Sequence, residues 1–408
     1  MSNIDVYKLR KYRSKNSRQP NSNTYLKKMQ FYEKQVGGLK LMKPKPTNDC
    51  PGINSYGKKI SACGYGSMKV KKDMELLEFA RRSPGPNDVV IEIHYCGVCH
   101  SDWHYIVGEW PARFPIIPGH EITGVVVKIG NRVKQFKIDD KVAVGPYVNS
   151  CRKCTRCKNG TEQNCENIAS WTYNGYERNP GDIEPTGDPT YGGFSNIITV
   201  NENYVFRLPD NLPMDAAAPL LCAGATTYYP LKHSGIGPGS RVGIAGIGGL
   251  GHIAVKLAKA MGAHVIALTT SKWKVADAKR LGADDAVLVT DKKDMEKYAS
   301  NLDLIIDTIP KVHDINQYLD LLAFDGILWM VGVFEELSFD MDAIGSMSRS
   351  IKSSIICGIS DINEMLDLCS KNNIVADIEK IPWSDVNITY DKIIKKTVKY
   401  RYVLDITH

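Results

Sequence analysis

The stretch RVGIAGIGGLGH, residues 241–252, carries a short apolar run into a glycine-rich turn and then into a helix-like segment. The turn fits the pattern G-x-G-x-x-G, which gains specificity from lying between a predicted strand and a predicted helix. Gly246 permits a tight turn, Gly248 lets the backbone approach a pyrophosphate, and Gly251 allows close packing of helix on strand. The alternative is a glycine-rich turn without a ligand. We predict a dinucleotide site at this helix N-terminus, formed by Gly246, Ile247, Gly248, Gly249, Leu250 and Gly251.

The segment around this turn alternates between apolar runs and helical patterns. Apolar runs occupy residues 264–268, 286–289, 304–306 and 327–331, and helical patterns cover 252–261 and 274–281. Strands that alternate with helices are typical of a parallel, doubly wound sheet. We therefore predict an α/β dinucleotide-binding domain over residues 206–354.

The end of the second predicted strand indicates which dinucleotide binds. Residues 268–274 read LTTSKWK, and no carboxylate appears before Asp277. An NAD site normally places an acidic residue here to accept from the ribose 2′-hydroxyl, whereas hydroxyl and ammonium groups bind a 2′-phosphate. The pattern favours NADP(H), with NAD as the alternative cofactor and solvated helix-start lysines as the alternative interpretation. The candidate phosphate ligands are the hydroxyls of Thr269, Thr270 and Ser271 and the ammonium groups of Lys272 and Lys274.

The segment before the glycine-rich turn has a different texture. Short β-like runs at residues 89–93, 124–127 and 141–144 are separated by turn residues, which indicates an irregular, mostly β domain. We assign it to residues 56–205. The last part of the chain, about 355–408, lacks the strand–helix rhythm and is expected to complete this first domain.

The basic character of the chain is concentrated at its start. The formal charge is +7, and residues 1–55 contain twelve Lys or Arg against three acidic residues, or +9, so the remainder sums to −2. We predict that 1–55 is a disordered extension. It supports an alternative function, a nucleic-acid-associated zinc protein, but few aromatics are interleaved with its charges. No apolar run approaches the roughly 20 residues of a membrane span and no secretory signal is seen, so we expect a soluble, cytoplasmic protein.

Four of the eleven cysteines gather in one short stretch, at Cys151, Cys154, Cys157 and Cys165. In an intracellular chain this clustering indicates metal binding rather than disulfides. Four thiolates suit a closed, tetrahedral structural zinc site. An iron–sulfur cluster and buried cysteines without a metal are the alternatives.

A second metal site is assembled from three distant residues, Cys99, His120 and Cys222. Two thiolates and one imidazole leave the fourth position of a zinc ion open, as a catalytic zinc requires. Spacing alone does not reveal this trio, since a single Cys or His is more often a packed core residue.

Several motifs together resemble the zinc-dependent medium-chain alcohol dehydrogenases, in the branch of cinnamyl alcohol dehydrogenases and bacterial broad-specificity aldehyde reductases. They occur in the family's order and include CGVCHSD at 96–102, PGHE at 118–121, the four-cysteine lobe, GGFS at 192–195, LLCAGATTY at 220–228 and KYRYV at 399–403. The resemblance runs from about Ile60 to Asp405. It implies a GroES-like catalytic domain beside a Rossmann domain, two zinc ions per chain, and hydride transfer between NADP(H) and an alcohol/aldehyde pair.

The resemblance also implies residue roles. Cys99, His120 and Cys222 would ligate the catalytic zinc, Glu121 would approach it during ligand exchange, and Asp102 would orient His120. Ser101 and His104 match the proton relay, which would connect the substrate oxygen with solvent. Thr226, Thr308 and Gly332 match cofactor-contacting positions. The family's 2′-phosphate-binding positions are matched by Thr269, Thr270 and Lys274.

Some features depart from the family or are left open by it. Ser353-Ser354-Ile355 stands where relatives have glycine followed by serine, and the loop 174–189 lies outside the common core. Trp110 and Trp171 lie in segments that border the substrate pocket in relatives, although core packing is an equally good interpretation. A small-molecule aldehyde or alcohol and a second copy of the chain, forming a homodimer, are the expected partners.

Overall fold

The computed structural model describes residues 45–47, 50, 55–56, 59–70, 73–332, 336–395 and 398–407. Most of the predicted basic extension lies outside these residues, and so does the hypothesis that it binds nucleic acid. Within the described part, no helix is both long and apolar enough to cross a bilayer.

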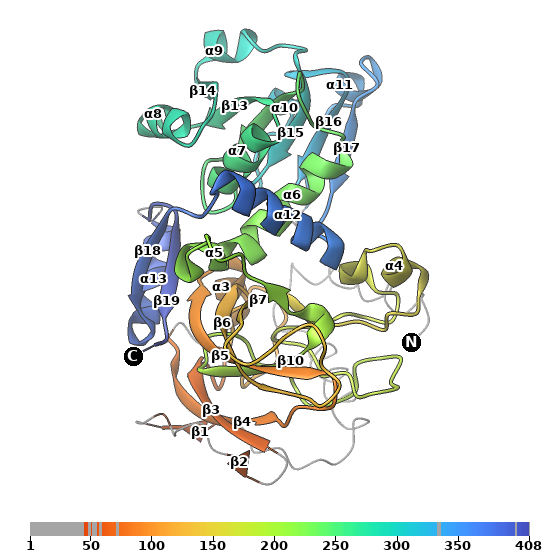
Figure 1. The fold of residues 1–408 in the computed structure, drawn as a ribbon. Helices are drawn as coiled ribbons and strands as arrows, with labels where there is room; N and C mark the ends of the chain where they lie inside the picture. Colours follow the sequence, from red (N-terminus) through yellow and green to blue (C-terminus); the bar gives the residue numbers. More distant parts are fainter. Residues whose placement is uncertain are drawn as a thin grey trace, which may run out of the picture. The chain divides into compact units, whose positions relative to one another are not determined.

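The first half of the described chain builds the two-stranded antiparallel pair of β8 (Tyr147–Asn149) and β9 (Ser170–Trp171) and two larger antiparallel sheets (Figure 1). The smaller has the order β1-β4-β3-β2, with β1 at Lys45–Pro46, β2 at Ser55–Tyr56, β3 at Lys59–Gly66 and β4 at Glu75–Arg82. The larger contains β5 (Asp88–Gly97), β6 (Ile122–Ile129), β7 (Lys141–Val144), β10 (Ile197–Asn201) and β11 (Phe206–Arg207). Strand β1 lies inside the segment that we assigned to the extension, and β2 begins at the last residue of that segment. Both strands form because each pairs with a longer strand of the catalytic domain.

The end of the chain returns to the larger antiparallel sheet. Strand β19 (Arg401–Asp405) pairs antiparallel with β5 and parallel with β18 (Ile378–Pro382), beside α13 (Val386–Ile394) (Figure 1). This pairing places Arg401 next to the strand that leads into Cys99, although the two residues are far apart in sequence. The return therefore contributes a side chain to the site described below.

The middle of the chain forms a six-stranded parallel sheet with the order β14-β13-β12-β15-β16-β17. Its strands are β12 (Arg241–Ala245), β13 (His264–Thr269), β14 (Asp285–Leu288), β15 (Leu302–Asp307), β16 (Leu322–Met330) and β17 (Ser350–Ser353). The order reverses between β12 and β15, which is where doubly wound sheets bind their ligands. The helices are α6 (Ala223–His233), α7 (Gly251–Ala260), α8 (Lys272–Arg280), α9 (Lys292–Glu296), α10 (Asn316–Leu319), α11 (Met341–Gly345) and α12 (Ile359–Asn372).

Both faces of the parallel sheet are buried. In β15, Leu304 and Ile306 belong to one apolar cluster, while Ile305 between them belongs to the other. Successive residues of a strand point to opposite faces, so helices must cover both sides of the sheet. This explains the near-continuous apolar runs of the sequence and confirms the α/β fold class.

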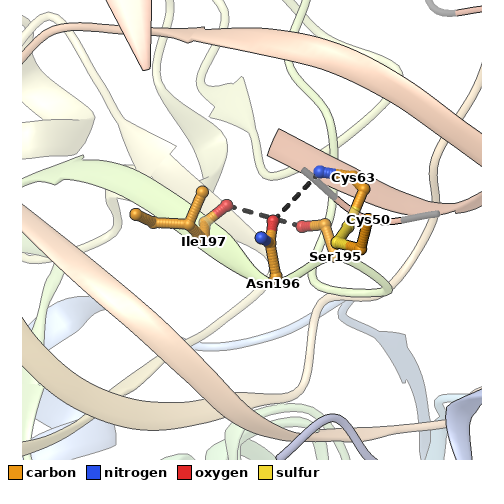
Figure 2. Close-up of a disulfide and its surroundings, with 5 residues drawn as sticks. All are labelled: Cys50, Cys63, Ser195, Asn196 and Ile197. Carbon is orange, nitrogen blue, oxygen red and sulfur yellow. Dashed lines mark hydrogen bonds between the residues drawn. A yellow bond between two sulfur atoms is a disulfide. The ribbon is translucent and has the colours of Figure 1, made fainter. Parts of the chain in front are cut away.

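The structure contains one disulfide that the spacing of the cysteines does not predict, outside the four-cysteine cluster. Cys50 and Cys63 are bonded, Cys50 exposed and Cys63 fully buried in β3 (Figure 2). The backbone of Cys63 exchanges hydrogen bonds with Asn196 through the Asn196 side-chain oxygen (3.0 Å) and backbone N–H (3.1 Å). The sheet determines the partner of Cys50. Strand β1 precedes Cys50 in the sequence and pairs with β4, whereas β2 follows Cys50 and pairs with β3, the strand that contains Cys63. The spacing of the cysteines along the sequence does not indicate that Cys50 pairs with Cys63.

Candidate functional site

The first part of the site is the start of a short helix, α3 (His100–Ile106). Cys99 is its N-cap residue, and the Cys99 N–H donates to the carboxylate of Asp102 at 3.0 Å. This contact fixes the first turn and holds the thiol of Cys99 beside Ser101, with Sγ and Oγ 3.5 Å apart. Two residues predicted for metal binding and proton transfer are therefore positioned by one turn of helix.

Three further residues converge on Cys99. Ligand atoms of Cys99, His120, Glu121 and Cys222 all lie within 4.8 Å of one another. A hydrogen bond from Cys222 lowers the pKa of Cys99 well below its ordinary value although burial opposes this, and the same contact raises the pKa of Cys222. One of the two sulfurs is thus already favoured as a thiolate, the form that binds a metal.

His120 is oriented by Asp102. The Nδ1 atom of His120 lies 3.1 Å from Oδ1 of Asp102, which also accepts the N–H of Gly119 at 3.1 Å. Asp102 is completely buried and serves both His120 and Cys99. With Nδ1 engaged, Nε2 is the atom left for a metal, the arrangement in which a carboxylate fixes the ring of a histidine ligand.

Glu121 is held from the far end of the chain. Its Oε1 accepts from Arg401 at 2.7 Å, and both side chains are buried. Its Oε2 is buried and has no hydrogen-bond partner among the residues that the structure describes. Burial raises the pKa of Glu121 to about 8, against the opposing charge of Arg401. Sequence reasoning named KYRYV as a motif but gave Arg401 no role, because nothing local indicates that it reaches Glu121.

The second predicted relay residue, His104, lies one helical turn after Ser101 in α3. His104 stacks between His100 and Trp110, with ring centroids 4.6 Å from each. The Nδ1 atom of His104 lies 2.5 Å from Oε2 of Glu109, whose side chain is 57% exposed. Sequence reasoning missed Glu109. Its distance of five residues from a predicted relay histidine was the available signal.

The four-cysteine lobe is compact. The sulfurs of Cys151, Cys154, Cys157 and Cys165 lie within 4.8 Å of one another, and two pairs are 3.9 and 4.0 Å apart. A tetrahedral zinc with Zn–S bonds of about 2.3 Å places its sulfurs about 3.8 Å apart. Cys154 caps the short helix α4 (Thr155–Lys158), and Cys151 accepts N–H groups from Lys153, Cys154 and Asn167. The donor set fits a closed metal site.

The glycine-rich turn joins β12 to α7 as predicted. Gly246 has φ of +85°, and a Cβ on Gly251 would lie 1.9 Å from the Gly246 oxygen, so both positions require glycine. At Gly248 a Cβ would meet no atom within 4 Å, which leaves the backbone open to a ligand. Thr308 fastens the turn by donating to the Gly246 oxygen at 2.7 Å.

The residues predicted to select the dinucleotide lie beside this turn. Lys274 donates to the carbonyl of Ile247 at 2.6 Å, and Thr269 accepts the N–H of Ser271 at 3.2 Å. Thr270 is exposed at the end of β13. The nearest acidic residue, Asp277, accepts from Arg280, Lys399 and Tyr400, which outweigh burial and lower its pKa to about 2.

Further positions from the sequence analysis lie in or near α6 and β17. Thr226 is buried one turn after Cys222 and donates to Ile355 at 3.2 Å. Ser353 does not have a positive φ, so the serine found where relatives carry glycine costs no backbone strain. Trp329 is 5% exposed and donates to Ser354, which supports core packing for this residue. Trp171 packs edge-on against Tyr147.

Comparison with known proteins agrees with this architecture. Residues 85–210 match the family model of the alcohol dehydrogenase GroES-like domain, and residues 249–371 match that of zinc-binding dehydrogenases. A probable zinc-type alcohol dehydrogenase-like protein of Acanthamoeba polyphaga mimivirus is 45% identical over 98% of this chain and 97% of its own length. An NADP-dependent alcohol dehydrogenase C of Mycolicibacterium smegmatis is 43% identical over 84% of this chain and 97% of its own.

Solved structures give the same result. A cinnamyl alcohol dehydrogenase from Sorghum bicolor superimposes with a TM-score of 0.80 at 38% identity, covering 85% of this chain and 97% of its own. A cinnamyl alcohol dehydrogenase from Helicobacter pylori, solved with NADP(H), superimposes with a TM-score of 0.79 at 38% identity, covering 85% and 99%.

Proposed function

The chain belongs to the zinc-dependent medium-chain alcohol dehydrogenases, in the branch of cinnamyl alcohol dehydrogenases and aldehyde reductases, and we propose that it transfers a hydride between NADP(H) and a primary alcohol/aldehyde pair. One observation carries the proposal. Cys99, His120 and Cys222 converge from three separate segments, beside a buried carboxylate oxygen of Glu121 that has no partner. Two thiols and an imidazole are ligands that zinc prefers, and three protein ligands leave a position for substrate.

The zinc and the nicotinamide supply the chemistry: when bound, the metal polarises the substrate oxygen as a Lewis acid and the ring gives or accepts the hydride. The residues of this chain orient the reactants and move the proton. Asp102 holds the ring of His120, and Arg401 holds one oxygen of Glu121 while the other stays available to the metal site.

The proton path starts at Ser101. Its hydroxyl lies 3.5 Å from Sγ of Cys99, inside the site, and can give a proton to the substrate oxygen or take one from it. His104 lies one turn further along α3 and is paired with the exposed carboxylate of Glu109. A buried site would otherwise trap the proton, so Ser101, His104 and Glu109 would connect it with solvent.

NADP(H) is favoured over NAD(H) by the groups at the end of β13. Thr269, Thr270, Ser271 and Lys274 offer hydroxyl and ammonium donors for a 2′-phosphate. Asp277, the nearest carboxylate, is committed to Arg280, Lys399 and Tyr400 and does not supply the acceptor that an NAD ribose needs. The relative from M. smegmatis is named as NADP-dependent.

We further propose that the four-cysteine lobe holds a structural zinc, giving two zinc ions per chain, and that Trp110 borders the pocket for an apolar or aromatic aldehyde. A homodimer is supported by β17, which is an edge strand of the parallel sheet and pairs only with β16 within the described part of the chain. Exposed apolar side chains lie in the neighbouring segments, Phe324 in β16 and Met341 in α11. A cytoplasmic location fits the use of NADP(H).

Metal analysis combined with an aldehyde screen tests the proposal. We expect about two zinc ions per chain and oxidation of NADPH, in preference to NADH, over aliphatic and aromatic aldehydes. Changing Cys99 and Cys222 together to alanine should remove one zinc and abolish turnover. A matched control, Cys369→Ala, removes a buried thiol of α12 that belongs to neither cluster and should change neither quantity. Full activity of the double variant would refute the proposal.

A further inference from the structure

A buried ion pair lies at the end of β15, just behind the glycine-rich turn. Asp307 is the last residue of the strand and is fully buried, and its Oδ2 lies 2.8 Å from Nε2 of His313. Its Oδ1 accepts the N–H of Ile309 at 2.9 Å. The side chain of His313 is 12% exposed. The pair closes residues 308–313, which we call the latch loop, back onto the strand that precedes it.

With Asp307 as a carboxylate, the geometry favours the protonated form of His313. Its second ring nitrogen, Nδ1, lies 2.8 Å from the carbonyl oxygen of Lys311. Both ring nitrogens therefore face oxygens that can only accept, and a neutral imidazole has only one N–H to donate. The arrangement is satisfied only by the imidazolium, which donates to both oxygens.

The latch loop is also part of the predicted cofactor site. Thr308 begins it and donates to the carbonyl oxygens of Ala245 at 3.0 Å and Gly246 at 2.7 Å. On the other side Gly332 packs so closely that a Cβ there would lie 2.5 Å from the Ile309 oxygen. The loop thus lies between two segments predicted to contact the dinucleotide, and its conformation affects both.

We infer that His313 is a positioning residue whose protonation fastens the latch loop and so promotes binding of NADP(H). The inference rests on the proposed function, because it takes NADP(H) as the ligand. Loss of the proton from His313 would weaken NADP(H) binding in two ways. One of the two oxygens would lose its donor, which loosens the loop. The buried carboxylate of Asp307 would also lose its countercharge and would repel an anionic cofactor.

The neighbours of His313 set the pH range of the effect. The titratable groups that face it are Asp307, Asp314 and Tyr318, whose ring packs edge-on at 5.7 Å. The hydrogen bond to Asp307 raises the pKa of His313 above its ordinary value, against the effect of burial. Burial raises the pKa of Tyr318, so it stays protonated. The contribution of a group with a raised pKa is complete below its unperturbed value and is lost as the pH rises through the folded value.

Equilibrium binding of NADPH, measured by protein fluorescence between about pH 6 and pH 9, tests the inference. We expect wild-type affinity to fall as the pH rises, and His313→Gln to bind about threefold to tenfold more weakly than wild type at the acid end and equally at the alkaline end. Tenfold corresponds to one pH unit in the pKa of a linked group. The comparison between variants removes the titration of NADPH itself.

The matched control is His264→Gln. His264 also lies near an aspartate, with Nδ1 3.7 Å from Oδ2 of Asp284. It is the first residue of β13, at the amino end of the strands, whereas the glycine-rich turn follows their carboxyl end. Its profile should follow that of the wild type. A ratio of affinities between His313→Gln and wild type that stays constant with pH would overturn the inference.

A second measurement needs no variant. Histidine side-chain NMR of the wild type should show that the pKa of His313 rises when NADPH is added, because coupling between two binding events is reciprocal. An unchanged pKa of His313 in the presence of bound NADPH would also overturn the inference. Absence of NADPH binding at every pH would instead contradict the proposed function.

Discussion

Single side chains of the site are fixed by partners that lie far away in the sequence. His120 is oriented by Asp102, and Glu121 by Arg401, which is 280 residues later. Each contact leaves one atom available, Nε2 of His120 and Oε2 of Glu121. Asp102 and Arg401 therefore determine which atoms of His120 and Glu121 face the proposed metal. Replacing one of these two partners should have other effects than replacing a metal ligand.

At about pH 9, where Glu121 is ionised in the wild type, Arg401→Met should destabilise the protein by about 3 to 5 kcal/mol, because it leaves the buried carboxylate without its partner. Urea unfolding of the zinc-loaded protein, followed by circular dichroism, measures the loss. The control is the double variant Glu121→Gln, Arg401→Met, which has no uncompensated buried charge and should be more stable than the single variant. A single variant as stable as the double one would contradict the role of the ion pair.

His104→Ala should slow turnover by about a hundredfold, the lower end of what a positioned acid–base group contributes. The pH profile of kcat should change while the zinc content does not, because His104 belongs to neither metal cluster. His94→Ala, on β5, serves as the control with normal kinetics. Full activity of His104→Ala at every pH would refute the relay assignment.

Short elements at the start of the described chain are stable only through the longer ones that they pair with. Strands β1 and β2 contain two residues each and flank Cys50, and both pair within the sheet that contains Cys63. Isolated strands of this length do not persist in water. The disulfide therefore adds a covalent link where the hydrogen-bonded contact is small.

Reduction of the Cys50–Cys63 disulfide should lower the free energy of unfolding of the catalytic domain by up to about 3 kcal/mol, the chain-entropy value for a loop of about 15 residues. The sequence separation is 13. Urea unfolding with and without dithiothreitol measures the difference. Cys50→Ser provides the control, since its stability should not respond to the reductant. Equal sensitivity of both proteins would show that the effect comes from other cysteines.

The whole molecule combines an irregular β domain with a parallel sheet that has an exposed edge. Strand β17 ends the sheet, and an uncovered edge is a site for pairing with another chain. Phe324 and Met341, each 66% exposed, lie in segments next to that edge. A homodimer would cover both features.

Changing Phe324 and Met341 together to glutamate should convert the proposed dimer into a monomer at micromolar concentration, because two charges would be buried in its interface. Light scattering after size-exclusion chromatography measures the mass. Ile183→Glu, at a side chain that is 61% exposed in the loop 174–189, is the control and should leave the mass unchanged. An unaltered mass of the double variant would place any interface elsewhere.

The sequence by itself determined the features that depend on neighbouring residues. The turn at 246–251 connects strand β12 to helix α7 through local backbone geometry. The fold class that this turn predicts is confirmed. The spacing of Cys151, Cys154, Cys157 and Cys165 places four sulfurs around one point because a single turn and a short loop connect them. The family followed from motifs of the same local kind, and the roles of the individual site residues remain predictions.

Only the tertiary structure decided which distant side chains meet. At the sequence level, the convergence of Cys99, His120 and Cys222 is predicted only through the family resemblance. The distant pairs Arg401–Glu121 and Cys50–Cys63 were not predicted, and neither was the nearby pair His313–Asp307. Each of these pairs forms because strand pairing or a closed loop brings its members together. Which residues pair in this way depends on how whole elements pack together. The local sequence around either residue does not predict it.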